Sequence, residues 1–203
     1  MLEKQRFQSF EDRSDATQTA ARVAALRQEL AARGLDGFLV PRADEFQGEY
    51  VPPSAQRLAW ISGFTGSWGL AAVFRDRAVV FVDGRYVLQV REQVDLNVFT
   101  PVHAHETPPP EWLEANLKKG ERLGYDPWLH TESGIEQLRA AATKAGAELV
   151  ACAGNPLDTV WEGRPPAPQA KVAVYDEAHA GETSASKRAR IAEDMRKSHL
   201  DAA

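Results

Sequence analysis

The spacing of apolar residues predicts an amphipathic helix near the beginning of the chain. This helix spans residues 14–33, and its buried face is formed by apolar side chains three or four positions apart, which are Val23, Leu26 and Leu30. Ser14 or Asp15 is a suitable N-cap residue, because its side-chain oxygen can accept a hydrogen bond from one of the first free amides. Gly34 predicts the end of the helix, since glycine readily adopts the left-handed conformation that follows helices.

Short apolar runs alternate with helical patterns along most of the remaining chain. Two β-rich runs joined by polar residues 75–77 predict a hairpin. The predicted strands cover residues 37–42, 68–74, 78–82, 96–102, 122–126 and 147–153. The other predicted helices cover residues 54–62, 83–94, 108–117 and 131–146. This alternation predicts an α/β fold built in layers around a mixed β-sheet.

The composition changes at Arg164, where three prolines fall within five residues. Such a stretch is typical of a linker, which we assign to residues 164–178. A further helix is predicted at residues 184–198. We therefore expect a first domain at residues 1–163, then the linker, and the start of another domain at residues 179–203.

The last predicted helix matches the first one in the positions of its apolar residues. Aligning the Leu-Asp pairs that follow the two helices superposes Leu26 on Ile191 and Leu30 on Met195. A strand follows the first helix at once, whereas the chain ends at the corresponding point of the second copy. We interpret the last helix as the beginning of a truncated second domain of the same type, and a chance match between two amphipathic helices is the alternative.

Composition and charge exclude several classes of partner. The chain of 203 residues is 43% apolar, which is enough to bury a sizeable core. Its net charge is −5 with acidic and basic residues interspersed, so we expect no nucleic-acid partner. The longest wholly apolar run, residues 78–82, is far too short to span a membrane. Residues 1–10 lack the apolar region of a secretory signal. The single cysteine makes a reducing cytoplasm the expected compartment.

The stretch SGFTGSWG, residues 62–69, places glycine at every third position. A phosphate-binding loop of this kind needs a lysine and a hydroxyl after its last glycine, or a helix behind it. Here Leu-Ala-Ala and a predicted strand follow, so nucleotide binding is disfavoured. We expect the three glycines to permit unusual backbone angles or close packing, and Thr65 and Ser67 to hydrogen-bond the turn.

Asp83 lies at the end of a predicted strand, where catalytic acids often lie in α/β proteins. We favour a structural role, in which Asp83 caps the following helix and Tyr86 packs. Arg85 lies in the first turn of that helix, where the helix dipole disfavours a positive charge. A carboxylate partner, within the chain or across an interface, would offset this cost, and an ordinary surface arginine is the alternative.

His103 and His105 alternate in a way that could place two imidazoles on one side of a strand end to bind zinc. A catalytic zinc site needs three protein ligands, and a pair in a proline-flanked loop is more typical of an exposed loop. The remaining histidines, His130, His179 and His199, are isolated, and the chain has no Gly-x-Ser-x-Gly motif. We therefore expect no catalytic residue and no metal ligand on this chain.

The tryptophans and the single cysteine indicate packing more than chemistry. Each tryptophan lies beside an apolar segment, and we expect core or domain-interface packing for Trp60, Trp68, Trp112, Trp128 and Trp161. Cys152 lies in an apolar run, so we expect a buried structural thiol. A single cysteine also excludes a disulfide within the chain.

Four segments together resemble the amino-terminal half of the cytosolic Xaa-Pro aminopeptidases of the three-domain type. They are RLAWISGFTGSWGLAAVF, AVVFVDGRYVLQVREQV, WEGRPPAP and HAGETSASKRARI. The resemblance extends over residues 22–203, in the order and spacing of the family. Its marker motifs match this sequence at Ser62, Gly63, Phe64, Thr65, Gly66 and Ser67, and at Asp83, Gly84, Arg85 and Tyr86.

The resemblance implies a creatinase/prolidase-type amino-terminal domain with ribonuclease-H-like, three-layer α/β architecture. It also implies that a second similar domain and a catalytic domain follow in the parent enzyme. In that family, two aspartates, a histidine and two glutamates of the catalytic domain hold two manganese ions, which activate the attacking water. None of these five ligands matches a position in this chain. We therefore expect the isolated chain to be inactive and to hold no cofactor of its own.

The resemblance further implies that this domain borders the active-site entrance and contributes to subunit contacts of a homodimer. The expected partners are the parent's other domains and its peptide substrate. Trp68, Arg85 and Tyr86 are the candidate contacts at this entrance. Phe46 stands where the family commonly has histidine, which puts any role of that histidine in doubt here. A stand-alone binding or self-association module without catalysis is the alternative function.

Overall fold

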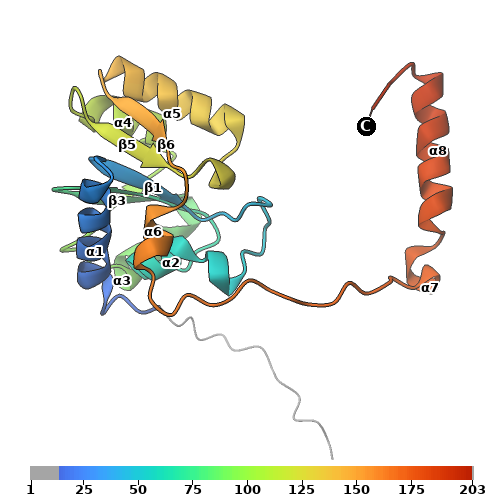
Figure 1. Ribbon diagram of the computed structural model, residues 1–203, viewed down its shortest axis with the longest axis horizontal. Helices are drawn as coiled ribbons and strands as arrows, with labels where there is room; N and C mark the ends of the chain where they lie inside the picture. The colour runs from blue at the N-terminus through green and yellow to red at the C-terminus, as the bar shows by residue number, and fades with distance from the viewer. Residues whose placement is uncertain (1–13, 203) are drawn as a thin grey trace, which may run out of the picture. The chain divides into compact units, whose positions relative to one another are not determined.

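The computed structural model describes residues 14–202 and is built around a sheet of six strands (Figure 1). The spatial order is β4-β3-β2-β1-β5-β6. Strand β2 runs antiparallel to β1 and β3, whereas the β3–β4, β1–β5 and β5–β6 pairs are parallel. The strands are β1 Gly37–Pro41, β2 Leu70–Phe74, β3 Ala78–Val82, β4 Thr100–His103, β5 Arg122–Tyr125 and β6 Glu148–Ala151. The predicted mixed sheet and the hairpin are confirmed.

Helices cover both faces of this sheet and produce three layers (Figure 1). One face is covered by α1 Thr19–Ala32, α2 Arg57–Ser62, α3 Gln89–Gln93 and α6 Pro156–Val160. The other face is covered by α4 Pro109–Asn116 and α5 Glu132–Lys144. The predicted three-layer α/β architecture is therefore confirmed.

The central strands are apolar at every position because both of their faces are buried. In β1, Phe38 and Val40 pack toward α1 and α2, and Leu39 between them packs toward α4 and α5. The same alternation occurs in β3, where Val80 and Phe81 lie in opposite layers of the core. The continuous apolar runs in the sequence are thus explained by their central position in the sheet.

The first helix begins later than its apolar pattern predicts. Val23, Leu26 and Leu30 are buried as expected, but α1 starts at Thr19 and its N-cap residue, Gln18, makes no side-chain capping bond. The Ser14 hydroxyl instead donates to the carbonyl of Gly63 at 2.6 Å. The Asp15 carboxylate accepts from the Thr17 amide at 3.0 Å, before the helix begins. Both predicted caps were therefore wrong, because Ser14 bonds to the 62–69 loop and Asp15 bonds within the segment that precedes α1.

The predicted helix at residues 83–94 is divided into a short 3₁₀ turn, η2 Gly84–Tyr86, and α3. Asp83 caps the turn as expected, since its carboxylate accepts a hydrogen bond from the Arg85 amide. The strand predicted at residues 96–102 begins only at Thr100, because the amides of Val98 and Phe99 both bond to the carbonyl of Asp95 in a turn. The predicted helix at residues 54–62 likewise divides into η1 Pro53–Ala55 and α2.

Residues 169–203 form a second compact unit, which is described here by itself. Residues 164–176 contain no helix or strand, and they are followed by α7 Glu177–Ala180 and α8 Ser184–Lys197. Ile191 of α8 and Leu200 after it are exposed. In the described range 14–202, no helix combines the length and the apolar character needed to cross a membrane. The segment considered for a secretory signal, residues 1–10, lies outside that range.

The tryptophans are used in more than one way. Trp112 packs on the rings of Phe74 and Phe81, with ring centroids 6.1 and 5.7 Å away. Trp128, by contrast, is 75% exposed, which excludes core packing for this residue, and packing at a domain interface stays a prediction. Cys152 packs against the core but is only partly buried, and desolvation raises the pKa of its thiol. A raised pKa favours the unreactive thiol form, as expected for a structural cysteine.

His130 follows the short 3₁₀ turn η3 Pro127–Leu129 and packs edge-on against the ring of Tyr125. Within the described part of the chain, its Nε2 atom is buried and has no hydrogen-bond partner. Burial lowers the pKa of this imidazole from 6.5 to about 4, and the nearby Asp126 opposes part of that shift. The folded protein therefore holds His130 neutral at a pH where the unfolded chain is protonated.

This difference predicts a loss of stability in mild acid. Above pH 6.5 both states are neutral at His130, and as the pH falls from 6.5 toward about 4 only the unfolded state gains the proton. The free energy of unfolding should therefore fall over this window, and the fall should be smaller in a His130→Phe variant. Urea unfolding, followed by tryptophan fluorescence at several pH values, measures this free energy of unfolding. His105→Gln, which changes an exposed imidazole, is the control, and equal slopes for wild type and His130→Phe would contradict this account.

Candidate functional site

The 62–69 loop begins where α2 ends, and its first glycine makes the turn. Gly63 adopts a φ of +83°, the left-handed conformation that closes a helix and that other residues rarely adopt. The Ser62 hydroxyl donates to the carbonyl of Leu58 at 2.6 Å and accepts from the Phe64 amide at 3.1 Å. The local hydrogen bonds of the turn therefore come from Ser62.

The other two glycines of this loop permit close packing. A Cβ atom at Gly66 would lie 2.2 Å from the Phe64 ring, and one at Gly69 would lie 2.9 Å from the Leu58 side chain. Phe64 is fully buried, so its ring cannot move away easily. Both expected roles of the glycines are found: Gly63 has an unusual backbone angle, and Gly66 and Gly69 permit close packing.

Thr65 and Ser67 bond across to the next motif. The Thr65 amide donates to the Gln93 side-chain oxygen at 3.0 Å, and the Gln93 amide group donates back to the Thr65 hydroxyl at 2.9 Å. The Ser67 and Tyr86 hydroxyls lie 2.6 Å apart. The expectation that Thr65 and Ser67 hydrogen-bond the turn did not include these partners, which come from the segment that contains η2 and α3.

The two marker motifs meet at Tyr86. Its ring packs edge-on against Phe64 at a centroid distance of 5.6 Å, and its hydroxyl bonds to Ser67. This hydrogen bond lowers the pKa of the Tyr86 hydroxyl from its usual value. The contacts join the loop after α2 to the turn after β3, so the motifs form one packed unit at this edge of the domain.

Arg85 has its carboxylate partner within the chain. Its guanidinium forms a two-pronged ion pair with Asp83, with a shortest distance of 2.7 Å, and lies 5.0 Å from the centre of the Tyr86 ring. The hydrogen bond from Arg85 lowers the pKa of Asp83, so the carboxylate is ionised near neutral pH. The Arg85 side chain remains mostly exposed, Trp68 is 41% exposed, and Tyr86 is half-buried against the core. Arg85 is thus satisfied by Asp83 without any substrate being needed.

The paired histidines do not complete a metal site. His103 lies at the end of β4, its Nδ1 is 3.1 Å from a carboxylate oxygen of Glu106, and its ring centre is 6.3 Å from that of His105. Among residues 14–202 there is no group of three histidine, cysteine, aspartate or glutamate side chains that could hold a metal ion. The described residues therefore do not form a metal centre.

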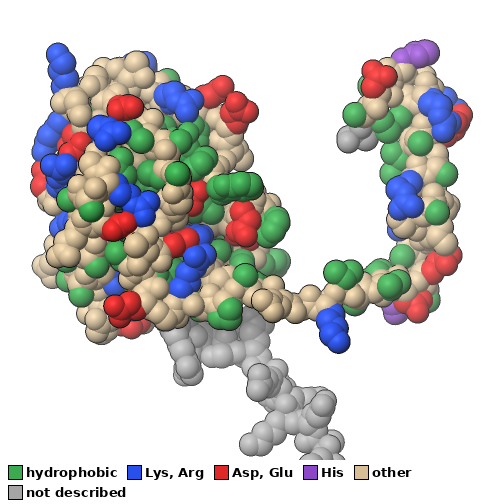
Figure 2. All heavy atoms as spheres, in the orientation of Figure 1, with side chains coloured by type: hydrophobic (Ala, Val, Ile, Leu, Met, Phe, Trp, Pro, Cys, Tyr) green, Lys and Arg blue, Asp and Glu red, His purple; other side chains and the backbone are tan. Residues whose placement is uncertain are grey.

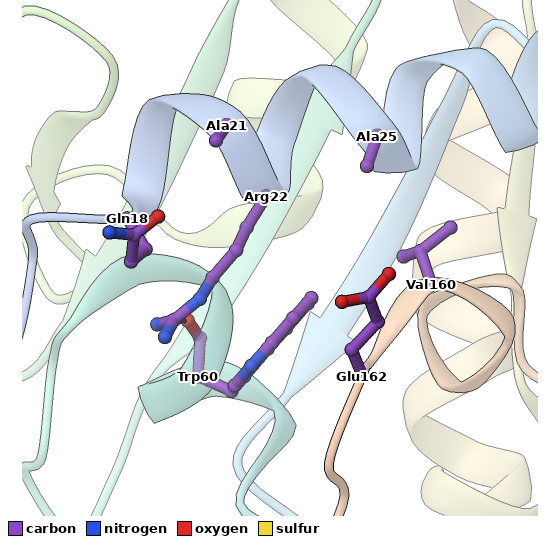
Figure 3. Close-up of a pocket in the computed structure, with 7 residues that line it drawn as sticks. All are labelled: Gln18, Ala21, Arg22, Ala25, Trp60, Val160 and Glu162. Carbon is purple, nitrogen blue, oxygen red and sulfur yellow. Dashed lines mark hydrogen bonds between the residues drawn. The ribbon is translucent and has the colours of Figure 1, made fainter.

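A hollow of about 330 Å³ lies between α1, α2 and the end of α6, and Figure 3 shows the residues that line it. Arg22 lies over the Trp60 ring at 5.0 Å and donates to the Trp60 carbonyl at 2.7 Å. Trp60 stacks in turn on Trp161 with a centroid distance of 5.3 Å. These contacts connect α1, α2 and the residue that follows α6. The polar and aromatic groups of the hollow therefore bond to one another, and we assign the hollow a packing role.

Sequence reasoning missed an ion-pair cluster around Asp158, in which only Arg57 is fully buried. Arg57 donates to both carboxylate oxygens of Asp158 at 2.7 and 2.8 Å, and Arg164 pairs with the same carboxylate at 2.7 Å. These residues are 101 and 6 positions from Asp158 in sequence, so no local spacing could reveal the cluster. Helical periodicity identified Arg57 only as part of a short helix.

Comparisons with known proteins agree with this geometry. Residues 22–160 match the model of the creatinase/prolidase N-terminal domain. The chain is 35% identical over 185 residues to Xaa-Pro aminopeptidase 2 of Sus scrofa. That match covers 91% of this chain but 28% of the relative, so the chain spans less than a third of the length of this enzyme.

Solved structures show the same relation. An X-prolyl aminopeptidase from Caenorhabditis elegans, a cytosolic enzyme with a di-nuclear active site, superposes with a TM-score of 0.81 and 26% identity. This match covers 91% of the present chain and 32% of that enzyme. The N-terminal, creatinase/prolidase-like domain of a metallopeptidase from Corynebacterium diphtheriae matches at a TM-score of 0.54 and 27% identity, over 68% of this chain and 99% of that one.

The fold and the packed motif pair define a three-layer α/β domain of the kind that precedes a peptidase domain in these relatives. The family match covers more than half of the chain. The chain belongs to the creatinase/prolidase N-terminal domain family, and its homologues are Xaa-Pro aminopeptidases.

The close packing at Gly66 predicts a specific cost of substitution. Gly66→Ala should reduce the free energy of unfolding by about 1–3 kcal/mol, because the added methyl group would overlap the buried Phe64 ring. Gly84→Ala is the matched control in the other motif, where the nearest atom to a new Cβ is His103 Nε2 at 3.4 Å. The control should change stability by less than about 0.5 kcal/mol. Urea unfolding of the two variants makes the comparison, and equal effects would refute the packing role of Gly66.

Proposed function

We propose that this chain is the non-catalytic amino-terminal part of a three-domain, manganese-dependent Xaa-Pro aminopeptidase. The observation that carries the proposal is the unequal coverage of the matches, which reach 91% of this chain but about 30% of the Xaa-Pro aminopeptidases. In this account the parent enzyme releases the amino-terminal residue that precedes proline. The two manganese ions and their ligands belong to the catalytic part, for which this chain contains no matching residues.

In this proposal, the domain shapes the active-site entrance and contributes to contacts between subunits. The exposure of Trp68 and Arg85 supports this role, because exposed side chains are available for contact. The hydrogen bond between Tyr86 and Ser67 supports it as well, because it holds the two motifs together. A firm wall at an entrance limits the size of the peptide and orients its amino end, which aids catalysis without bond-making chemistry. The partners would be the parent's own remaining domains, the peptide and a second subunit, in the cytoplasm.

Residues 179–203 are proposed to begin a second domain of the same type, after a linker at residues 164–178. The exposure of Ile191 on α8 and of Leu200 after it supports this proposal, because an exposed apolar residue of a helix usually packs against a sheet or another helix. Thr183 caps α8 by accepting a hydrogen bond from the Ser186 amide, so this helix has its own start signal, independent of the first domain.

An activity assay tests the proposed division of labour. The purified 203-residue chain, supplied with Mn²⁺, should hydrolyse an Xaa-Pro-Pro peptide no faster than buffer does. The chain joined to the portion of the Caenorhabditis elegans enzyme that lies beyond the matched region should hydrolyse it in a metal-dependent manner. Metal-dependent hydrolysis by the chain alone, lost in His103→Ala, would overturn the proposal.

A stand-alone self-association module is the second candidate, and the exposed apolar residues of the second unit favour it. It predicts that the 203-residue chain forms a defined oligomer, which light scattering after size-exclusion chromatography would detect. Removal of residues 179–203 should then reduce the mass to that of a monomer. An unchanged mass after the deletion would count against this candidate.

A further inference from the structure

A hollow of about 440 Å³ in the first unit is lined by residues that the two family motifs do not use. Its volume lies within the range of about 300–1,000 Å³ that is typical of small-molecule sites. The lining comes from the loop after β1, from α2, from η3 and from the segment around α6. We call it the Arg57 hollow, and its charged and aromatic side chains are Glu45, Arg57, Asp126, Trp128, Asp158 and Arg164.

Arg57 brings a buried cation with one unused nitrogen to this hollow. It is 6% exposed, and its Nε and Nη2 atoms donate to the Asp158 carboxylate at 2.7 and 2.8 Å. The third nitrogen, Nη1, is buried and has no hydrogen-bond partner among the described residues. A guanidinium has five N–H donors in a rigid fork, and the pair with Asp158 does not use them all. Because a buried donor without a partner is costly, an oxygen acceptor beside this nitrogen is favourable.

Arg164 brings a second guanidinium to the same hollow. Its Nη1 atom lies 2.7 Å from a carboxylate oxygen of Asp158, and its Nε atom donates to the carbonyl of Ser54 at 2.7 Å. One carboxylate therefore serves two guanidinium groups, which leaves one positive charge without a counter-charge in this cluster. A ligand carboxylate is a suitable counter-charge, because guanidinium groups bind carboxylates through strong, charge-assisted hydrogen bonds.

Acidic side chains line the hollow as well. The Asp126 carboxylate accepts from the Trp128 amide and from the Asn155 side chain, both at 3.0 Å, so both of its oxygens are engaged. Glu45 is exposed, and its carboxylate is available to a cation. Figure 2 shows acidic and basic side chains interspersed over the visible face of the first unit. A ligand with an anionic and a cationic end complements such a mixed lining better than a simple anion does.

Trp128 supplies an apolar wall. Its backbone amide is fixed by Asp126, whereas its indole is 75% exposed. Gly154 lines the hollow too, and a Cβ atom added there would meet no atom within 4 Å, so the space beside this backbone is open. An apolar side chain of a ligand can cover the indole, which removes apolar surface of both partners from water.

We propose that the Arg57 hollow binds a short peptide in its zwitterionic form, with both termini free. The peptide carboxylate accepts hydrogen bonds from Arg57 and Arg164. The ammonium group pairs with Glu45, and an apolar side chain covers Trp128. This site goes beyond the proposed function, because none of the residues proposed for the entrance lines the hollow and binding there involves no bond cleavage.

Isothermal titration calorimetry of the 203-residue chain with the dipeptide Leu-Phe tests the proposal. We expect saturable binding at one site. The carboxyl-terminal amide of the dipeptide should bind at least tenfold more weakly, because it lacks the charge that the two arginines recognise. The N-acetylated dipeptide should also bind several-fold more weakly, because it lacks the ammonium group that pairs with Glu45.

Substitutions at the margin of the hollow locate the site. Glu45→Gln, Trp128→Ser and Arg164→Gln should each weaken binding of the dipeptide several-fold. Arg75→Gln is the matched control for Arg164→Gln, because Arg75 pairs with Asp36 and does not line the hollow. The control should bind the dipeptide as tightly as the wild type does. Thermal unfolding of each variant verifies that the variant is folded under the conditions of the titration.

Three results would overturn the proposal. The first is the absence of saturable binding, or equal affinity for the dipeptide and its amide. The second is equally tight binding of inorganic phosphate, because the hollow would then be a simple anion site. The third is binding that is unchanged in Glu45→Gln and Arg164→Gln, because the peptide would then bind elsewhere on the chain. Each result is obtained without a catalytic domain, so it is distinguishable from a failure of the proposed function.

Discussion

Burial of both faces of the central strands is the constraint on which the rest of the domain depends. Strands β1, β2 and β3 contain almost only apolar residues, so helices must cover the sheet on two sides. One helix layer is formed by α1, α2, α3 and α6, and the other by α4 and α5. The family motifs lie where α2 leads into β2 and where β3 leads into α3, and their conformation follows from the packing beneath them.

The marker motifs identify the family through packing. Gly66 leaves room for the Phe64 ring, and Tyr86 joins that ring to the Ser67 hydroxyl. Asp83 caps its turn and neutralises Arg85 in the same contact. Each of these residues is satisfied by neighbours within the domain. A sequence can therefore carry a recognisable peptidase signature here although the described residues form no metal site.

Periodicity predicted the sheet, the hairpin and the two-sided packing, because these depend on local apolar patterns. It failed where a side chain had a distant partner: Ser14 bonds to Gly63 instead of capping α1, and no local pattern indicates that Thr65 bonds to Gln93. The exposed Trp128 and the shared Asp158 could not be predicted either, because they depend on segments far apart in sequence. The family resemblance supplied the functional expectation, and the contacts of the domain show which surfaces are free to serve it.

The count of bound manganese tests the central claim most directly. The 203-residue chain, dialysed with Mn²⁺ and then against metal-free buffer, should retain no stoichiometric manganese when measured by plasma mass spectrometry. The same chain joined to the catalytic portion of a relative should retain two ions per polypeptide. Stoichiometric manganese on the chain alone would contradict the account, because it would place a metal centre within the amino-terminal domain, for which a non-catalytic role is proposed.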